Sequence, residues 1–482
     1  MTLAKLLDGV EIIESWGNID VKISGISFNS NEVKPGDVFV CIKGFKTDGH
    51  DYACDALEKG AVAIIAQRRI EETAATTVVV ENTRYALSCI AAAFYDHPYR
   101  KFRLIGVTGT NGKTTTTYLI KAILESCGQT VGLIGTNQNM IGDTVIPSHH
   151  TTPDSLELMR LFDQMASDGV DSVVMEVSSH SLALDRVAFC EFDIGAFTNV
   201  TQDHLDFHGT MENYTRAKAL LFKKCRVGVF NADDEAFSAL IQDCSCKVMT
   251  YSTKTDCDYR AQNIEYRATG VEFDLLYNGK SERIKLSIPG GFSVYNALTA
   301  AGCCLSAGLS LSDISKGLES AKGVKGRIEV VETNTDYTVI IDYAHTPDGL
   351  FNILSAIRGF AKGRIVTLFG CGGDRDKTKR PQMGKIAGEL SDFCIVTSDN
   401  PRSEEPSAII EDILTGLKET NCRYAVVENR FEAIEFALDN AKADDIILLA
   451  GKGHEPYQIL KDRTIVFDER EIVLKLIDSS ET

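Results

Sequence analysis

The sequence lacks the long apolar run that a membrane span requires. No hydrophobic stretch approaches the roughly 18 residues needed to cross a bilayer. The N-terminal segment, residues 1–17, is interrupted by Asp8, Glu11 and Glu14, which argues against a secretory signal peptide. We therefore expect a cytoplasmic protein with no membrane insertion.

Positive charge is also scarce. The 482 residues contain 50 Lys and Arg against 68 Asp and Glu, which gives a formal net charge of −18. Because nucleic-acid binding requires clustered cations opposite the phosphates, this balance argues against a nucleic-acid partner. The acidity is instead consistent with a surface that keeps the protein in solution.

The chain has 14 cysteines but no Cys-x-x-Cys pair. The cysteines are scattered, and several lie in apolar runs: Cys41, Cys89, Cys303, Cys304 and Cys394. In a chain of this length, that distribution predicts buried free thiols in a reducing compartment.

The alternation of short apolar runs and helical stretches predicts an α/β protein of three domains. The length allows two to four domains, and 44% hydrophobic residues are enough to bury ordinary cores. We place the domains at residues 1–101, 102–327 and 328–482, and we find no internal repeat, low-complexity tract or long linker. The first domain should be small, with strands at 37–42, 61–66 and 77–80 and helices at 52–59 and 85–95.

The second and third domains should each contain a mostly parallel sheet with helices on both faces. In the second, strands are predicted at 103–107, 131–134, 172–177 and 193–197, around a P-loop-type centre. In the third, strands at 338–342, 364–369, 393–397, 424–427 and 445–450 alternate with helices at 348–359, 381–390, 406–418 and 431–441. That alternation predicts a doubly wound, Rossmann-like domain.

Residues 106–120, GVTGTNGKTTTTYLI, predict a phosphate-binding loop between a strand and a helix. The spacing departs from G-x-x-x-x-G-K-[ST], because the first glycine of that pattern would fall on Val107. Gly109 and Gly112 allow backbone N–H groups to approach phosphate oxygens. Lys113 offers a cation to the β- and γ-phosphates, and the Thr114 hydroxyl can hold Mg²⁺. A turn before a capped helix is the alternative, but it does not explain Gly-Lys ahead of four threonines.

Acidic and basic residues after the next strands fit a nucleotide site. Glu176 follows an apolar strand, where an acidic magnesium ligand is expected. His204 and His208 lie among acidic residues, and we favour His204 as a ligand. Lys218 lies in an apolar helical context and would by itself be interpreted as a lysine whose ammonium reaches the surface.

Seven motifs in order resemble the Mur ligase family, the ATP-dependent amide-forming enzymes of peptidoglycan precursor synthesis. They are GTNGKTTT, TTP, EVSSH, TNVTQDHLDFHG, Y-x-x-AK-x-x-LF, GRIE and DYAHTPDGL. The family's phosphate loop has the altered spacing seen here. The resemblance covers the whole chain and implies three domains like those drawn above.

The resemblance implies roles for individual residues of the nucleotide site. Those implied to contact ATP are Gly109, Thr110, Asn111, Gly112, Lys113, Thr114, Thr115, Asn296, Arg327 and Asp342. Those implied to be catalytic are Lys113, Lys218, His204 and His345. Thr114, Glu176, His204 and a carbamylated Lys218 would hold Mg²⁺, since carbamylation turns an ammonium into an anion.

The resemblance also implies sites for a UDP-sugar peptide and for an amino acid. The first, for UDP-N-acetylmuramoyl-L-alanyl-D-glutamate, comprises Ser30, Phe45, Lys46, Thr47, Thr151, Thr152, Ser178 and Arg186. The second, for meso-2,6-diaminopimelate, comprises Arg375, Asp399, Asn400, Pro401, Arg402, Gly451 and Glu455. Leu184 departs from a substrate-contacting glutamine of some relatives, and Phe28 and Phe45 depart from the family at positions that bear on the uridine contacts.

The last block resembles the family members that add the third residue of the peptide, in their diaminopimelate form. A guanidinium can bind the far carboxylate of diaminopimelate through two parallel hydrogen bonds, which lysine cannot accept. The alternative without a binding role is that Asp399-Asn400-Pro401-Arg402 is only a turn before a helix, with Arg402 in solvent.

The implied reaction is a two-step ligation in a monomer, with closure of the domains assembling the site. ATP phosphorylates the D-glutamate side-chain carboxylate, and the amine of diaminopimelate then attacks the acyl phosphate. The alternatives are a lysine-adding ligase, a ligase like folylpolyglutamate synthase, or, from another class, a nucleotide switch that hydrolyses ATP slowly while regulating a partner.

Overall fold

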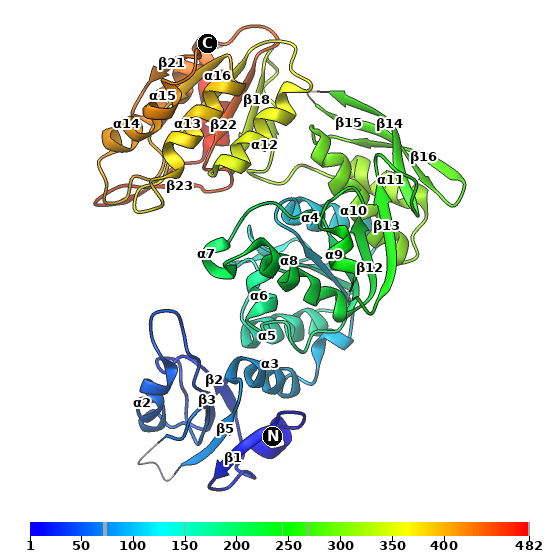
Figure 1. Ribbon diagram of the computed structural model, residues 1–482, viewed down its shortest axis with the longest axis vertical. Coiled ribbons are helices and arrows are strands. Elements are labelled where there is room, and N and C mark those ends of the chain that lie inside the picture. Colours follow the sequence, from blue (N-terminus) through cyan, green and yellow to red (C-terminus); the bar gives the residue numbers. More distant parts are fainter. Residues whose placement is uncertain (71–74, 149, 243, 268, 481–482) are drawn as a thin grey trace. The chain divides into compact units, whose positions relative to one another are not determined.

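The computed structural model describes residues 1–70, 75–148, 150–242, 244–267 and 269–480. They form two compact units, Met1–Tyr251 with Thr299–Leu309, and Ser252–Leu298 with Ser310–Thr482. Both units combine sheets with helices (Figure 1). Within the described ranges, no helix is both long and apolar enough to span a bilayer.

The first sheet of unit 1 has the order β1-β5-β4-β3-β2. Its strands are β1 (Ile12–Trp16), β2 (Gly25–Ser27), β3 (Asp37–Val40), β4 (Ala63–Ala66) and β5 (Thr76–Val80), and only β1 is antiparallel to its neighbour. The helices around it are α1 (Leu3–Leu6), η1 (Gly49–Tyr52), α2 (Ala53–Glu58), α3 (Thr83–Phe94) and η2 (Pro98–Arg100). The Asn82 side chain starts α3 by accepting the N–H groups of Arg84 and Tyr85.

The second sheet of unit 1 runs β13-β12-β11-β6-β10-β7-β8-β9. Its strands are β6 (Arg103–Thr108), β7 (Val131–Ile134), β8 (Asn139–Ile141), β9 (Thr144–Ile146), β10 (Ser172–Glu176), β11 (Phe192–Phe197), β12 (Cys225–Asn231) and β13 (Lys247–Ser252). Strands β7, β10, β6, β11, β12 and β13 are parallel along this order. Their carboxyl ends therefore share one edge, where polar loop residues meet.

Helices of unit 1 cover this second sheet. They are α4 (Lys113–Ser126), α5 (Ser155–Ser167), α6 (Ser179–Ala183), α7 (Leu205–His208), α8 (Met211–Ala219), η3 (Leu220–Lys223) and α9 (Phe237–Ile241). One core joins α5 to the sheet through Phe162, Met165 and Phe192, none more than 1% exposed. Burial of such side chains contributes about 1.5–3 kcal/mol each.

Unit 2 begins with an antiparallel meander that the sequence analysis did not predict. Strands β14 (Tyr259–Arg267), β15 (Gly270–Tyr277) and β16 (Lys280–Leu286) pair in order, and α10 (Gly291–Ser306) and α11 (Leu311–Ser320) follow. Asn278 and Gly279 join β15 to β16, both with left-handed φ of +49° and +73°. Asn-Gly is the pair that a two-residue hairpin turn favours, so the sequence did contain this signal.

The remaining strands of unit 2 form a six-stranded sheet in the order β17-β18-β22-β19-β20-β21. They are β17 (Glu329–Val331), β18 (Thr338–Asp342), β19 (Ile365–Phe369), β20 (Phe393–Val396), β21 (Arg423–Val426) and β22 (Ile446–Ala450), with β23 (Tyr457–Ile459) and β24 (Thr464–Val466) as a separate hairpin. All but β17 are parallel within the large sheet. The helices are α12 (Pro347–Arg358), α13 (Lys379–Leu390), α14 (Pro406–Leu417), α15 (Arg430–Asp439) and α16 (Glu469–Ser480).

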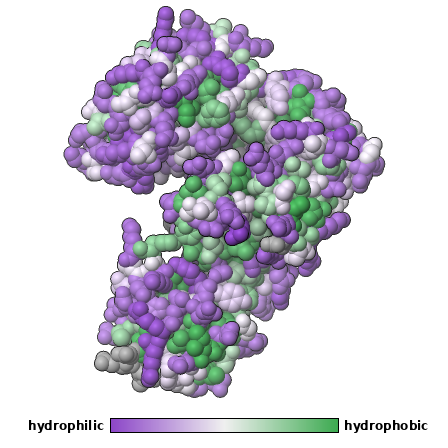
Figure 2. Space-filling model, in the orientation of Figure 1, coloured by the Kyte–Doolittle hydropathy of each residue, from purple (hydrophilic) through white to green (hydrophobic). Residues whose placement is uncertain are grey.

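Two cores lie on opposite faces of this six-stranded sheet. Ile340 of β18 packs with α12 to α14, whereas its neighbours Val339 and Ile341 pack with α15 and α16. Successive residues of a strand point to opposite faces, so a continuous apolar run is what a sheet covered on both sides requires. On the face that Figure 2 shows, the surface of the part of unit 2 that contains this six-stranded sheet is mostly hydrophilic.

The structure confirms the predicted α/β class. The ends of the strands and helices predicted for residues 328–482 lie within two residues of the observed ends. All 14 cysteines are free, and the five predicted to be buried are buried.

Candidate functional site

The loop between β6 and α4 has the geometry of a phosphate-binding loop. Gly109 and Gly112 have positive φ of +152° and +83°. A β-carbon at Gly109 would collide with the Thr198 hydroxyl, so only glycine fits there. The first turn of α4 leaves backbone N–H groups without intrahelical acceptors, and the helix dipole makes this end partly positive.

Lys113 and Thr114 open α4 and face different partners. The Lys113 ammonium lies over its own loop, 2.9 Å from the carbonyl oxygens of Gly109 and Thr110. The Thr114 hydroxyl donates to Glu176 Oε1 at 2.9 Å. The predicted strand-end acid therefore lies beside the predicted loop, because β10 and β6 are adjacent parallel strands that end at the same edge.

Glu176 is 1% exposed and is held by oxygen and nitrogen donors. Besides Thr114, it accepts the Thr136 N–H at 2.9 Å and the Thr136 hydroxyl at 3.0 Å. A β-carbon at Gly135 would lie 2.5 Å from Glu176 Oε1, so this glycine leaves the carboxylate its space. A carboxylate beside a threonine hydroxyl is the oxygen ligand set that suits Mg²⁺, which also takes substrate phosphates and waters.

Lys218 on α8 is 1% exposed, contrary to its interpretation in isolation as a surface-reaching lysine. Its Nζ lies 4.2 Å from the ring centroid of Tyr214, whose hydroxyl is 3.1 Å from Thr110 Oγ1 in the phosphate loop. Burial first, and then the charge of Lys113, lowers the Lys218 pKa well below its usual value. The structure therefore places a buried amine, whose neutral form is favoured, at the edge of the phosphate loop.

His204 lies at the start of α7 with a left-handed φ of +52°. Its ring is 4.7 Å from that of His180, and its Nε2 is 3.4 Å from Asp203 Oδ2. His208 instead bonds Ser179 Oγ through Nε2 at 3.0 Å. In the part of the chain that the structure describes, no three His, Cys, Asp or Glu side chains gather closely enough to hold a metal ion.

Residues predicted for the sugar peptide surround the carboxyl end of β10. Thr152 Oγ1 donates to the Glu176 carbonyl at 2.8 Å and accepts the Ser178 N–H at 3.1 Å. Arg186 Nη1 donates to the Thr152 carbonyl at 2.8 Å. Thr151 accepts a hydrogen bond from Thr136, the residue that also holds Glu176.

The turn at 45–47 belongs to unit 1 and is held by a residue that the sequence analysis missed. Arg84 Nη2 on α3 donates to the Lys43 carbonyl at 2.8 Å, and the Gly44 N–H bonds the Thr47 carbonyl. Burial and the charge of Arg186 lower the Arg84 pKa. Arg84 and Arg186 are thus two partly buried cations close enough to repel each other, and an anion bound near them would be stabilised. Phe45 is 78% exposed and contacts Phe207 edge to face.

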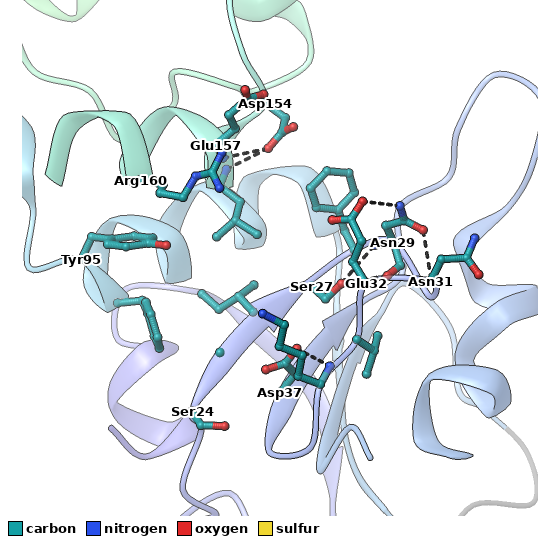
Figure 3. A pocket seen from close by; sticks show the side chains of 17 residues that line it. Ser24, Ser27, Asn29, Asn31, Glu32, Asp37, Tyr95, Asp154, Glu157 and Arg160 are labelled. Carbon is teal, nitrogen blue, oxygen red and sulfur yellow. Dashed lines mark hydrogen bonds between the residues drawn. The ribbon is translucent and has the colours of Figure 1, made fainter. Parts of the chain in front are cut away.

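A cavity of about 880 Å³ opens between β2, the loop after it, and the start of α5 (Figure 3). It is lined by aromatic residues and by hydrogen-bonding groups, among them Phe28, Asn29, Tyr95, Asp154 and Arg160. Asn29 and Asn31 flank the predicted Ser30, but Ser30 and the 45–47 turn do not line this cavity. The sequence analysis missed it, because α5 begins at Ser155, far along the chain from β2, which ends at Ser27.

Unit 2 holds the other residues predicted for ATP. Asn296 on α10 is 5% exposed. Asp342, at the end of β18, accepts the N–H groups of Ile328 and Ala344, and burial raises its pKa. The Arg327 guanidinium lies 4.9 Å from the centroid of the Tyr343 ring. His345 is exposed, and its Nδ1 is 2.7 Å from the Tyr343 carbonyl.

The predicted diaminopimelate residues converge at the end of β20. Asn400 donates to Glu455 Oε2 at 2.9 Å and accepts from Ile459 N–H and from Lys452 Nζ. A β-carbon at Gly451 would lie 2.7 Å from Asp399 Oδ2. Four of the predicted residues, Asp399, Asn400, Gly451 and Glu455, thus lie together.

Arg402 and Arg375 flank Gly372 in the neighbouring loop. A β-carbon at Gly372 would lie 2.9 Å from Arg402 Nη1 and 3.8 Å from Arg375 Cγ. Arg402 Nη1 donates to the Gly373 carbonyl at 2.9 Å, and Arg375 Nη1 donates to the Asp374 carbonyl at 3.1 Å. The bend at 399–402 is therefore more than a solvent-exposed turn.

Comparison with known proteins matches three family descriptions along the chain. Residues 22–95 match "Mur ligase family, catalytic domain", residues 107–304 match "Mur ligase middle domain", and residues 326–453 match "Mur ligase, glutamate ligase domain".

Two relatives matched over the full length are named UDP-N-acetylmuramoyl-L-alanyl-D-glutamate–2,6-diaminopimelate ligase, the second with the suffix 1. The chain is 53% identical to one from Caldanaerobacter subterraneus subsp. tengcongensis over 100% of both chains. It is 50% identical to one from Clostridium acetobutylicum over 99% of both.

Solved structures agree with this similarity. One of the same name is 31% identical, with a TM-score of 0.75 over 100% of this chain and 99% of the other. A Mycobacterium tuberculosis folylpolyglutamate synthase is 18% identical, with a TM-score of 0.63 over 77% of this chain and 92% of the other, and shows the fold alone. The chain belongs to the Mur ligase family.

Proposed function

We propose that this chain joins meso-2,6-diaminopimelate to UDP-N-acetylmuramoyl-L-alanyl-D-glutamate at the expense of ATP, in peptidoglycan precursor synthesis. The observation that carries the proposal is the full-length identity of about 50% with ligases of that printed name. The cluster around the 399–402 bend supports the choice of amino acid, because it combines acidic side chains with two arginines.

ATP binds at the 109–115 loop in this proposal. The backbone N–H groups of Gly112 and Thr115 lie in the loop and first helical turn, where phosphate oxygens would accept them. Thr110 and Asn111 shape the loop, because their N–H groups donate to the carbonyl and the side chain of Asn199. Lys113 neutralises the β- and γ-phosphates, and Thr114 with Glu176 provides the oxygen ligands for Mg²⁺. When bound, the cation offsets charge on the transferred phosphoryl group. His204 is a further Mg²⁺ ligand in this proposal, and in unit 2 Asn296, Arg327, Asp342 and His345 are the residues assigned to the nucleotide.

Lys218 is carbamylated in this proposal. Carbamylation requires the neutral amine, whose nitrogen attacks CO₂ and loses a proton to give an N-carboxylate. Burial and the neighbouring Lys113 favour that neutral form. The product replaces a buried cation within electrostatic reach of Lys113 with an anion, which Lys113 would stabilise.

The UDP-sugar peptide lies along unit 1. The partly buried Arg84 and Arg186 supply positive charge near the 45–47 turn, which fits a diphosphate, and Ser30, Phe45, Lys46 and Thr47 contact the same group. The cavity beside Ser30 has aromatic walls and hydrogen-bonding groups that fit a uracil base. Thr151, Thr152 and Ser178 hold the peptide near Glu176.

Diaminopimelate lies at the 399–402 bend. Asp399 and Glu455 are acidic and lie with Asn400 and Gly451, which suits an ammonium group. Arg402 and Arg375 suit a carboxylate. Pro401 sets the bend between these two groups of residues.

The reaction has two steps. The side-chain carboxylate of D-glutamate attacks the γ-phosphorus, which forms an acyl phosphate and releases ADP. The amine of diaminopimelate then attacks the acyl carbon, the C–O bond to phosphate breaks, and the amine proton leaves, giving amide and inorganic phosphate. Catalysis by these residues is mainly positioning and charge neutralisation.

The proposal extends to organisation and location. The domains are residues 1–101, 102–327 and 328–482, a division that the three family matches support. The enzyme works as a monomer in the cytoplasm, which the free cysteines support.

A product assay tests the proposal. The protein is incubated with UDP-N-acetylmuramoyl-L-alanyl-D-glutamate and ATP, together with equal concentrations of diaminopimelate and lysine, and products are identified by mass spectrometry. The diaminopimelate tripeptide should dominate, with one phosphate released per amide. A lysine product would refute the assigned amino acid, and phosphate release without any amine would refute ligation.

A further inference from the structure

Two loops carry the arginines assigned to diaminopimelate, and they leave the same edge of the unit 2 sheet. Residues 370–378 follow β19 and contain Arg375, and residues 397–405 follow β20 and contain Arg402. Strands β19 and β20 are parallel neighbours, with Phe369 paired to Val396. The sheet brings the loop bases together, but it does not by itself set the distance between the loop tips.

The loop tips are joined by direct hydrogen bonds. The Gly373 N–H donates to the Asn400 carbonyl at 2.9 Å, and Ser403 Oγ donates to Asp374 Oδ1 at 2.6 Å. Asp374 and Arg402 have left-handed φ of +53° and +51°, which non-glycine residues rarely adopt. Such conformations persist only where the surroundings hold them in place.

Glu404, in the second loop, makes further contacts with the first loop and with α13. Its Oε1 accepts the Asp374 N–H at 2.7 Å and Arg380 Nη2 at 2.9 Å, and its Oε2 accepts Arg380 Nη1 at 3.1 Å. One carboxylate therefore binds the first loop by its backbone and the base of α13 by a two-bond ion pair. Arg380 and the Asp374 N–H hold the Glu404 pKa down to about 2, so the carboxylate is charged.

Arg380 has no exposed surface. Its other contacts are Asp412 Oδ2 on α14 at 2.8 Å and the Gly372 carbonyl at 3.3 Å. Burying a guanidinium is costly, and a well-packed apolar side chain usually stabilises such a position as well or better. A buried ion pair at this point is thus better explained by the geometry it imposes than by the stability it contributes.

We infer that Arg380 and Glu404 are positioning residues that hold the Arg375 loop against the Arg402 loop, so that both guanidiniums can reach one carboxylate. The inference rests on the proposed function for the identity of that carboxylate. Neither residue contacts the substrate. Their effect should fall on diaminopimelate binding and should spare ATP and the UDP-sugar peptide.

Two matched substitutions test the inference. Glu404→Gln keeps the size of the side chain but removes its charge, and with it the ion pairs to Arg380 on α13 and to Lys377 in the first loop. Asp412→Asn removes the charge of the other carboxylate that bonds the Arg380 guanidinium. Asp412 lies on α14, and its side chain is 45% exposed. We expect Glu404→Gln to raise the KM for diaminopimelate about tenfold or more. Its KM values for ATP and the UDP-sugar peptide should stay within about twofold of wild type, and Asp412→Asn should leave all three KM values within that range.

Hydrogen exchange measures the same positioning without any substrate. Backbone amides at 372–378 and 400–405 should exchange faster in Glu404→Gln than in wild type, and at the wild-type rate in Asp412→Asn. Arg380→Lys keeps the charge but loses the planar fork, so it should resemble Glu404→Gln more weakly. If Arg380 variants fold poorly, the comparison of Glu404→Gln with Asp412→Asn still tests the inference.

The possible outcomes separate the inference from the proposed function. Equal effects of Glu404→Gln and Asp412→Asn on the KM for diaminopimelate and on exchange would overturn the positioning role, and so would no effect of either. A wild-type protein whose phosphate release ignores diaminopimelate would overturn the proposed function. In that case, faster amide exchange in Glu404→Gln than in Asp412→Asn would still support the role of Glu404 in joining the two loops. Equal exchange in the two variants would refute that role.

Discussion

Arg402 offers the sharpest test of substrate choice. Its Nη1 donates hydrogen bonds to the Gly373 carbonyl at 2.9 Å and to the Asn400 carbonyl at 3.4 Å. Among the described residues, Nε and Nη2 have no hydrogen-bond partner, and these two groups form one side of the guanidinium fork. The remaining pair matches the two oxygens of a carboxylate.

The expected magnitude follows from those two hydrogen bonds. Each hydrogen bond to a charged group contributes about 1.5–3 kcal/mol, so Arg402→Ala should lose about 3–6 kcal/mol of binding to the far carboxylate. At about 1.4 kcal/mol per factor of ten, kcat/KM for diaminopimelate should fall about 10²- to 10⁴-fold. Lysine lacks that carboxylate, so its kcat/KM should change little and the preference for diaminopimelate should collapse.

The assay compares kcat/KM for both amino acids in wild type, Arg402→Ala and Arg402→Lys. Arg402→Lys should be intermediate, because it keeps the charge without the fork. Arg358→Ala is the control, since this half-exposed arginine of the same unit also bonds a carboxylate and a carbonyl. Equal losses for diaminopimelate and lysine in Arg402→Ala would refute the reasoning.

The other predictions concern the phosphate loop, the buried lysine and a histidine. Lys113→Ala should lower ATP turnover at least about 100-fold, because it removes the cation that the proposal assigns to the β- and γ-phosphates, and near-normal turnover would contradict the ATP assignment. Lys218→Ala should be nearly inactive and partly restored by short carboxylic acids; failure of every acid to restore phosphate release would count against the carbamate. Burial, then Arg327 and Lys325, lower the His454 pKa from 6.5 to about 4, so an unfolded chain takes up this proton first as the pH falls. The stability that depends on neutral His454 is therefore present above pH 6.5 and lost as the pH falls from 6.5 to about 4. In thermal unfolding, His454→Phe should lose less stability than wild type across that range, and parallel curves would contradict it.

The local pattern of the chain was enough to predict most of the sheet in unit 2. The run 446–450 is apolar at every position, and 338–342 is apolar at its three central positions, because residues on both faces of a covered strand are buried. The meander at 259–286 was missed, since its strands are exposed on one face and their apolar residues are interspersed with charged ones. The Asn278-Gly279 turn was the available signal.

Site residues divide in the same way. Gly109, Gly112 and Lys113 were predictable because a phosphate loop is a local structure, formed within a few residues of one strand and one helix. Lys218 was misjudged in isolation, because burial depends on what packs against α8. Arg84 and Glu404 were missed, since their partners lie about 30 to 40 residues away and no short motif contains both.

The sequence by itself determined the alternation of strands and helices, the conformation of the phosphate loop and, through ordered motifs, the family. These are set by side-chain periodicity and by glycine's access to positive φ, which act over a few residues. Only the tertiary structure decided that Lys218 is buried beside the phosphate loop, that Arg84 holds the 45–47 turn, and that Arg380 joins two loops through Glu404. Burial and charge pairing arise between residues distant in the chain, so no local pattern could specify them.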